Sequence, residues 1–191
     1  MGRPRSFDDH EVVERAMETF WTYGYAGTSP AQLAEAVGIG KGSLYNAFGS
    51  KRDLFDRSLR RYDQLGGALA EEHLNGPGTT HECVGAFLRF LVDMDVQQPV
   101  RRGCLAVNTA VELAGHDAEI LTLIRTMQER SIAALAARIE RGRREGDVDR
   151  GSDPRALAEF LMTTIMGLRV MAKTYDSPTL HRVVDNALRL L

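Results

Sequence analysis

Apolar residues recur at helical spacing along almost the whole chain. Between about residues 8 and 23, Val13, Ala16, Met17 and Phe20 fall on one face of a helix, and later segments repeat this spacing. No run of alternating β-branched residues is long enough to predict a sheet. The pattern therefore predicts an all-α fold.

Capping residues and glycines mark where the helices begin and end. Ser29, Pro30 and Gln32 combine an N-cap, a first-turn proline and a reciprocal capping residue. Asp8 with Glu11 and Ser50 with Asp53 also have the spacing of a cap pair. The expected helices run over about 8–23, from 29 to the turn at 38, 40–49, 51 to the early 70s, 80–97, 104–115, 117–145, 154–174 and 178–190.

Residues 29 to 48 form the most informative segment, because they predict two short helices joined across a glycine turn. Ala34 is small where the helices would cross, and Gly38 suits a left-handed turn. The apolar positions of this unit are Leu33, Ala34, Val37, Ile39, Leu44 and Phe48. This arrangement is typical of a helix-turn-helix, whose second helix enters the major groove of DNA.

The distribution of charge agrees with DNA binding better than the total does. The formal net charge is −2, but residues 36 to 62 contain six basic and only two acidic residues. A phosphate backbone responds to this local charge rather than to the sum over the chain. No apolar run reaches the roughly 18 residues of a membrane helix, and with two cysteines we expect a cytoplasmic protein with free thiols and no membrane partner.

The last two helices carry continuous apolar seams. Their spacing fits helices that pack nearly parallel, either in a four-helix dimer interface or in the core of a monomer, and periodicity does not decide between the two. The candidate interface residues are Leu157, Leu161, Thr164, Leu168, Leu180, Val184 and Leu188.

The segment from Thr28 to Lys51 resembles the N-terminal signature of the TetR family of transcriptional regulators. The preceding Ala16-x-x-x-Phe20-x-x-x-Gly24-Tyr25 and the following Leu54-Phe55 agree with it. One departure is Gly40, where a Ser or Thr commonly caps the reading helix. Residues 76 to 191 resemble the family in helix number and length, with a weaker likeness in the Gly103-Cys104-Leu105-x-x-Asn108 segment.

The resemblance implies a two-fold homodimer that binds a palindromic double-stranded DNA operator and releases it when a small-molecule effector binds. We expect a DNA-binding domain over residues 1–50 and an effector and dimerisation domain over residues 51–191, with the helix from about 51 to 74 connecting them. Repression is the expected activity, and activation is the alternative. No enzyme activity, cofactor or metal is expected.

The candidate DNA contacts come from both the chemistry and the resemblance. Lys41 can donate to guanine or phosphate, Asn46 suits adenine, and Gly42 lets the backbone approach the duplex. Tyr45 is expected to point outward to a phosphate, or to pack at the surface. The helix-start residues Thr28, Ser29 and Lys51 can hold phosphates, and Ser43 can serve base or phosphate. Arg3 and Arg5 can form an arm along the DNA backbone or minor groove, or belong to a solvated tail.

The effector site is less defined. Asn108, Glu112 and His116 lie one helical turn apart, and this polar stripe can line a pocket or face solvent or a partner subunit. Residues that could face it from other helices are Phe87, Met127, Met162, Met166 and Tyr175.

Cys104 follows two arginines at a helix start, a setting that favours a reactive thiol. It could sense oxidants or electrophiles within the same DNA-binding framework, or pack as an inert small residue. Three further interpretations remain. An enzyme could use Cys104 as nucleophile and His116 as base, although the sequence indicates no third residue to orient them; Cys83, Cys104 and His116 could bind a metal; and the chain could be a helical protein that binds a partner protein. The last would leave the basic cluster without a task.

Overall fold

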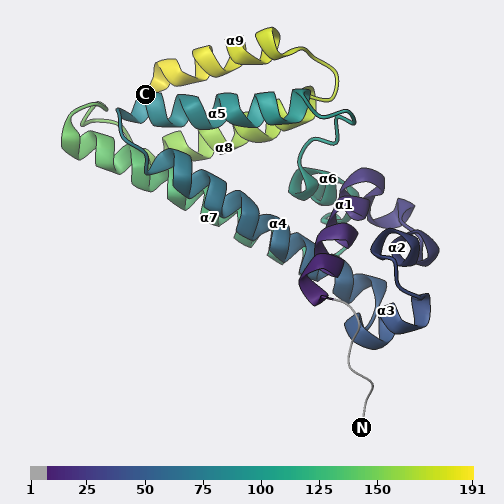
Figure 1. Cartoon of the computed structure of the whole chain (residues 1–191). Helices are drawn as coiled ribbons and strands as arrows, with labels where there is room; N and C mark the ends of the chain where they lie inside the picture. Colours follow the sequence, from purple (N-terminus) through teal and green to yellow (C-terminus); the bar gives the residue numbers. More distant parts are fainter. Residues whose placement is uncertain (1–7) are drawn as a thin grey trace. The chain divides into compact units, whose positions relative to one another are not determined.

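The computed structural model describes residues 8–191, and this part of the chain consists of α-helices without a strand (Figure 1). The order is α1 (Asp9–Gly27), α2 (Pro30–Val37), α3 (Lys41–Phe48), α4 (Lys51–Leu74), α5 (Thr80–Val96), α6 (Leu105–Leu113), α7 (Ala118–Glu145), α8 (Pro154–Met171) and α9 (Ser177–Ala187), then a 3-10 helix, Leu188–Leu190. The all-α prediction is confirmed. None of the described helices has the length and hydropathy needed to cross a bilayer.

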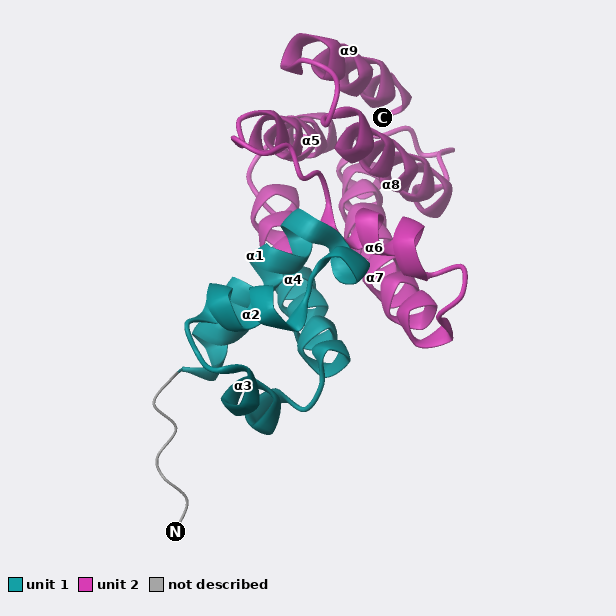
Figure 2. Cartoon of the chain, turned by 90° about the vertical axis from the view of Figure 1, so that its right-hand side faces the viewer, with its two compact units in different colours: residues 1–65 teal, residues 66–191 magenta. Residues whose placement is uncertain are grey.

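The chain divides into two compact units, residues 1–65 and 66–191 (Figure 2). The division falls within α4, which continues from the first unit into the second. The sequence places the domain boundary earlier, at residue 50. The first turns of α4 belong to the first unit because Leu54 and Phe55 are fully buried, and the Phe55 ring packs edge to face on Phe20 of α1 at 4.9 Å.

The first unit closes its core around the end of α1. Gly24 has a φ of +75° and interrupts the helix, which then continues for one short turn to Gly27. The break brings the Tyr25 ring to 4.8 Å from Phe55. A positive φ is strained for residues with a side chain, so glycine is required at this position.

Two predicted capping boxes are confirmed in the first unit. At α2 the Gln32 N–H donates to the Ser29 hydroxyl at 3.2 Å, and the Ser29 N–H donates to the Gln32 side chain at 2.7 Å. At α4 the Asp53 N–H donates to Ser50 Oγ at 3.1 Å, and the Ser50 N–H donates to Asp53 Oδ2 at 2.9 Å. These hydrogen bonds from Ser50 hold the pKa of the Asp53 carboxyl below its ordinary value.

The start of α1 differs from the predicted cap pair. Asp8 caps the helix by accepting the His10 N–H at 2.9 Å, as an N-cap residue should. Glu11 accepts a hydrogen bond from Arg15 at 2.6 Å, one turn further along. The spacing of Asp8 and Glu11 permits a reciprocal box, but the carboxylate of Glu11 pairs with a cation instead.

The second unit packs α5 against α7, α8 and α9, and α8 lies along α7 (Figure 1). Leu88 of α5, Ile139 of α7, Leu161 of α8 and Leu180 of α9 are all essentially inaccessible to solvent. They belong to one continuous apolar core. The periodic seams of the sequence thus meet inside a single chain.

This core corrects the residue choice for a dimer interface. Five of the seven candidates, Leu161, Leu168, Leu180, Val184 and Leu188, are buried in their own chain. Their side chains are therefore not on the surface of the isolated unit, while Leu157 and Thr164 are half-buried. The periodic pattern identifies the apolar face of each helix correctly, but α5 and α7 of the same chain cover it.

A buried ion pair joins α5 to α8 in the second unit. Asp95 Oδ2 lies 2.5 Å from Arg169 Nε, and both side chains are at most 6% exposed. Arg169 also donates to the carbonyl of Gly103 at 3.3 Å. Burial raises the pKa of Asp95, and the positive charges of Arg169 and Lys173 oppose that rise.

The loop before α6 is held against the end of α8 by this pair and by further contacts. Lys173 donates to Asn108 Oδ1 at 2.8 Å, and the Asn108 amide donates to the Arg102 carbonyl at 2.9 Å. Gly103 has a φ of +66°, and a Cβ on it would lie 2.6 Å from the Arg169 carbonyl oxygen. The loop can therefore lie so close to α8 only with glycine at this position.

Candidate DNA-binding interface

The turn between α2 and α3 has the geometry that the sequence predicts. Gly38 is left-handed, with φ +71° and ψ +21°, and its N–H donates to the Ala34 and Glu35 carbonyls. Leu33 and Leu44, from the two helices, are fully buried. The two helices are thereby fixed to each other by a buried contact and a glycine turn, which is the framework of a helix-turn-helix.

The outer face of α3 is polar and open. Lys41, Gly42, Ser43 and Asn46 are all exposed to solvent. A Cβ added to Gly42 would have no atom of the described chain within 4 Å. Packing within the chain therefore does not require this glycine, whereas close approach of the α3 backbone to a ligand would.

Gly40, the departure from the family pattern, begins α3 without a side-chain hydrogen bond. Its φ of −59° is accessible to any residue. Glycine here therefore removes a cap hydroxyl without being required by the backbone.

Tyr45 differs in orientation from the expectation that it points outward. The residue is half-buried, but its hydroxyl oxygen is covered and has no hydrogen-bond partner in the described residues. Burial raises the pKa of Tyr45, with a smaller contribution from Tyr25. A covered hydroxyl without a partner is unfavourable, so Tyr45 has a donor and acceptor that the protein alone does not use.

The two hydroxyls before α2 are placed differently. Thr28 is fully buried, and its hydroxyl donates to the Gly24 carbonyl at 2.6 Å, so the structure does not present it as a surface contact. Ser29 is exposed and accepts the Gln32 N–H, which leaves its own hydroxyl hydrogen for another acceptor. Ser29 can therefore cap α2 and bind a phosphate at the same time, whereas the hydroxyl of Thr28 is buried and bonded within the chain.

Lys51, in the first turn of α4, holds its ammonium 4.3 Å from the centre of the Tyr25 ring. This cation–π contact orients a positive charge at the start of a helix, where backbone N–H groups also favour anions. Two other α4 cations contact the protein: Arg61 pairs with Glu14 at 2.7 Å, and the Arg57 guanidinium lies 5.3 Å from the Phe48 ring centre. Arg3 and Arg5 lie outside the described residues.

The candidate effector residues are scattered between core and surface of the second unit. Phe87 and Met127 are buried, His116 is exposed, and Tyr175 is 49% exposed. The candidates of intermediate exposure are Cys104, Asn108, Glu112, Met162 and Met166. The side-chain amide of Asn108 is already bonded to Lys173 and Arg102, so it acts first as a connection between α6 and α8.

Sequence reasoning missed the buried Asp95–Arg169 pair. The available signal was Asp95 itself, which follows Leu88, Leu91 and Val92 at helical spacing on the buried face of α5. A carboxylate at such a position needs a partner in the core. Within residues 8–191, no three His, Cys, Asp or Glu side chains form a group that could hold a metal ion.

Two protein families match most of the chain. Residues 12–57 match the family "Bacterial regulatory proteins, tetR family", and residues 82–188 match the family "Tetracyclin repressor-like, C-terminal domain". The second match alone spans more than half of the 191 residues. The chain belongs to the TetR family.

Individual TetR-family proteins are similar along the full length. The HTH-type transcriptional regulator YezE of Bacillus subtilis strain 168 is 32% identical over 194 residues and covers 100% of both chains. The HTH-type transcriptional repressor ComR of Escherichia coli K12 is 29% identical, over 99% of this chain and 91% of ComR. A cysteine mutant of the TetR-family regulator CifR, complexed with 26-bp double-strand operator DNA, is 36% identical with a TM-score of 0.89, covering 98% of each chain.

The family establishes the class of activity. This TetR-family protein is a DNA-binding transcriptional regulator and not an enzyme. TetR-family regulators are dimers, and structural neighbours bind operator DNA, so the partners are double-stranded DNA and a second copy of the chain.

Proposed function

We propose that this TetR-family protein is a repressor that leaves a palindromic operator when a small molecule binds its second unit. The exposed polar face of α3 is the observation that carries the proposal, because several solvent-facing polar groups lie there beside a side-chain-free Gly42. The repressor names of relatives such as ComR agree with this sign of regulation. Since the target is chromosomal DNA, the proposal places the protein in the cytoplasm.

In this proposal α3 lies in the major groove and each of its polar residues has a separate task. The Asn46 amide presents a donor and an acceptor that match adenine, and the Lys41 ammonium matches guanine O6 and N7 or a phosphate. Ser43 serves a base or a phosphate, and Gly42 allows the backbone near the duplex. Ser29 and Lys51 hold phosphates at the starts of α2 and α4.

The dimer contact is proposed on the outer faces of α8 and α9. Exposed apolar side chains there are Phe160 and Val170 of α8, which are 45% and 49% exposed, and Leu190 of the 3-10 helix that follows α9, which is 52% exposed. Half-buried Leu157 and Thr164 remain available beside them. These residues replace the four buried leucines and the one buried valine of the seams as interface candidates, because only an exposed side chain can meet a partner.

Operator binding is tested with fluorescence anisotropy on the DNA upstream of the protein's own gene. Asn46→Ala is expected to weaken binding to that fragment at least tenfold while leaving weak binding to unrelated DNA unchanged. Asn75→Ala, which removes the same amide from an exposed position after α4, is the matched control. Equal weakening in both variants, or in neither, would show that Asn46 does not read a base of the operator.

Lys51 is tested through the salt dependence of the same binding. Lys51→Ala is expected to weaken binding to all DNA sequences and to lower the magnitude of the log–log salt slope by about 1, because one phosphate is no longer neutralised. Arg57→Ala, in the following turns of α4, is expected to leave the slope unchanged because its guanidinium lies over Phe48. An unchanged slope for Lys51→Ala would show that Lys51 does not bind a phosphate.

A second candidate for the signal is an oxidant or electrophile that reacts with Cys104. The thiol is half-buried at the N-cap of α6, whereas Cys83 is buried and close to the Gly76 and Pro77 carbonyls. N-ethylmaleimide, which forms a bond between its alkene carbon and Sγ and takes up the thiol proton, is expected to release operator from the native protein. Cys104→Ser would remain bound and Cys83→Ser would still be released; release of Cys104→Ser would exclude this signal.

A further inference from the structure

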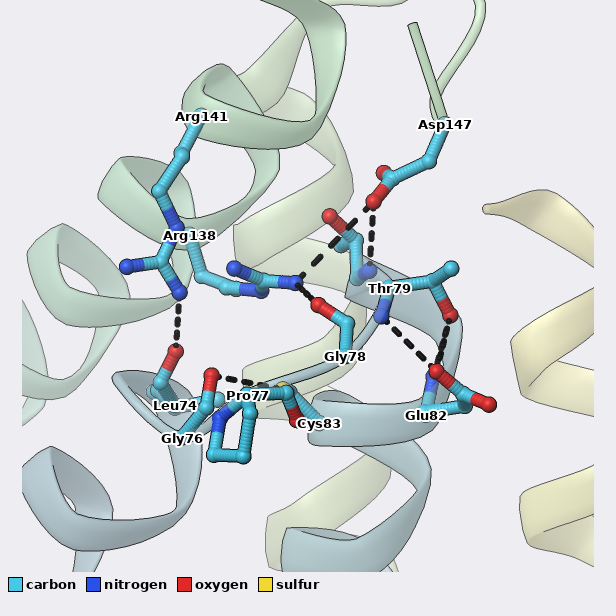
Figure 3. A network of polar contacts seen from close by, with 11 residues as sticks. Leu74, Gly76, Pro77, Gly78, Thr79, Glu82, Cys83, Arg138, Arg141 and Asp147 are labelled. Carbon is cyan, nitrogen blue, oxygen red and sulfur yellow. Dashed lines mark hydrogen bonds and ion pairs between the residues drawn. The ribbon is translucent and has the colours of Figure 1, made fainter. Parts of the chain in front are cut away.

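Five arginines lie between residues 138 and 150, at the end of α7 and in the loop that follows it. Two of them connect α7 to the end of α4 and to the turn after it (Figure 3). Arg141 donates to the Leu74 carbonyl at 2.9 Å, and buried Arg138 donates to the Gly78 carbonyl at 2.6 Å. These two guanidinium groups therefore hold the second unit together.

The other three arginines, Arg143, Arg144 and Arg150, line a surface hollow of about 270 Å³, here called the arginine hollow. Arg143 is fixed in its wall, because Nη1 donates to the Ser152 carbonyl at 2.9 Å and Nε lies 3.3 Å from the Glu140 carboxylate. These contacts leave the Nη2 donors unused. In the described part of the chain, the exposed side chains of Arg144 and Arg150 have no hydrogen bond or ion pair. Donors that the protein does not use therefore surround the hollow.

The end of α7 explains only part of this arrangement. Carbonyl groups at a helix C-terminus favour cations in the last turn, where Arg143 and Arg144 lie. Arg150 is outside the helix, beyond the C-cap residue Gly146, and the loop brings it to the same hollow. Three like charges around one hollow repel one another unless an anion lies between them. The arrangement therefore indicates an anion site.

The carboxylate of Asp147 does not supply that anion, because it is used at the start of α5. It accepts the Thr80 N–H at 3.0 Å, beside the capping box formed by Thr79 and Glu82 (Figure 3). Gly142 of α7 makes room for this contact, because a Cβ there would overlap the Thr80 hydroxyl and Asp147 Oδ1. Asp147 is thus held away from the lining of the arginine hollow.

The remaining carboxylates of this segment also lie outside the lining. Asp149 accepts the Gly151 N–H at 3.1 Å, and Asp153 accepts the Arg155 N–H at 2.9 Å at the start of α8. These two groups and exposed Glu145 give the same loop negative charge. They would repel an extended polyanion such as duplex DNA or an anionic membrane, whereas one compact anion can contact the arginines alone.

We propose that the arginine hollow binds the phosphate group of a small molecule. A guanidinium can donate two parallel N–H groups to phosphate oxygens, and here guanidinium groups come from both the helix and the loop. The volume is just below the range of about 300 to 1,000 Å³ that is usual for small-molecule pockets, which suits a phosphate with a small organic group. The site uses none of the residues proposed to contact the operator.

Calorimetric titration of the DNA-free protein with sodium pyrophosphate, in a buffer without phosphate, tests the site. We expect one site per chain with a dissociation constant of about 1 mM or tighter. Arg144→Gln/Arg150→Gln is expected to weaken binding at least about tenfold, because two charged donors are removed. The matched control, Arg60→Gln/Arg125→Gln, removes the same charge from exposed positions outside the hollow and should bind within about twofold of the native protein.

Both double variants change exposed side chains without partners in the described chain, so their melting temperatures should match that of the native protein. Absence of saturation at about 10 mM pyrophosphate in calorimetry and in phosphorus NMR, or equal weakening in the two double variants, would overturn the proposal. Unchanged pyrophosphate binding in Arg144→Gln/Arg150→Gln together with weaker binding to unrelated duplex DNA or to anionic vesicles would also overturn it.

Titrations with ribose 5-phosphate and with inorganic phosphate distinguish two sources of the phosphate group. Tighter binding of ribose 5-phosphate would support the proposal and assign the arginine hollow to an organic phosphate ester. Equal binding of the two would support a site for phosphate itself. In either case the affinity should fall in Arg144→Gln/Arg150→Gln and stay unchanged in the control variant.

Discussion

Polar side chains are exposed on α3 of the first unit but buried and paired in the second unit. On α3, Lys41, Ser43 and Asn46 are exposed to solvent, whereas in the second unit Asp95 and Arg169 are buried together and Asn108 has both ends of its amide bonded. Polar groups that bind a ligand must be exposed, so that they can exchange bound water for the ligand. Polar groups that hold helices together must instead stay bonded to the protein. Pairing in the interior therefore marks structure, and open polar groups mark recognition.

The largest expected effect is on the interior side of this comparison. Asp95→Ala leaves the Arg169 charge buried without its carboxylate, and is expected to lower the free energy of unfolding by about 3 kcal/mol or more. Denaturant unfolding at one fixed protein concentration measures it. Asp93→Ala, on the same helix, removes a carboxylate that is 40% exposed beside His181 and should change stability by less than about 1 kcal/mol.

Two measurements test whether the Asp95–Arg169 ion pair stabilises the packing of α5 on α8. Asp95→Leu combined with Arg169→Met is expected to recover part of the stability, since an apolar pair has no charge to desolvate. A single Asp95→Ala variant as stable as Asp93→Ala would show that the buried pair does not fix α5 to α8, and the contrast between the units would disappear.

Tyr45 lies between the two classes, because its hydroxyl is covered but has no partner among the described residues. Tyr45→Phe removes only that hydroxyl, so it is expected to leave the melting temperature unchanged or slightly higher. If the hydroxyl reaches a phosphate in the complex, affinity for the upstream DNA falls about tenfold, as for one hydrogen bond to a charged group. Unchanged affinity in anisotropy titrations would show that Tyr45 only packs.

Substitutions at Gly38 and Gly42 distinguish an effect on folding from an effect on DNA binding within the first unit. Gly38→Ala places a side chain at φ +71° and is expected to cost about 1 kcal/mol of stability. Gly42→Ala meets no described atom within 4 Å and should be neutral or stabilising, yet it should weaken DNA binding. Thermal unfolding and anisotropy distinguish them; a Gly42→Ala variant with native affinity would show that the backbone does not approach the duplex.

The smallest expected effect is the acid response of the α4 cap. The pKa of Asp53 is lower in the folded protein than its ordinary value of 3.8, so its contribution is complete above that pH and is lost as the pH falls through the lowered value. The free energy of unfolding of Asp53→Asn should therefore be lower than that of the native protein at neutral pH, and the two values should converge below pH 3.8. A constant stability difference between neutral pH and acid, followed by circular dichroism, would contradict this cap.

Helices and their caps are predictable because they depend on neighbours in sequence. Ser29, Gln32, Gly38 and the Ser50–Asp53 pair all act within a few residues of chain, so their spacing predicts them correctly. At Asp8 and Glu11 the same spacing predicts a box that does not form, because Arg15 takes the Glu11 carboxylate. Thr28 shows the limit: its place before a helix predicts a phosphate contact, but the break at Gly24 brings a carbonyl within reach of its hydroxyl.

The second unit is less predictable for a related reason. The seam through Leu161 and Leu168 correctly indicates an apolar face, but periodicity contains no information on whether α5, α7 or a second subunit covers it. Asp95 and Arg169 are 74 positions apart, and only the packing of α5 on α8 brings them together. Sites assembled from distant segments therefore remain undetermined until the helices are packed.

Gly142 has a consequence for how the second unit assembles. At this position in the last turns of α7, the Thr80 hydroxyl and the Asp147 carboxylate come within contact of a helix backbone, and any Cβ would overlap both. A shift of α7 by a single residue would bring Arg141 or Arg143 to that place and be blocked by its side chain. The absence of a side chain at Gly142 therefore favours the present alignment of α7 against Thr80 at the start of α5 over packings shifted by one residue, which the apolar faces alone would tolerate.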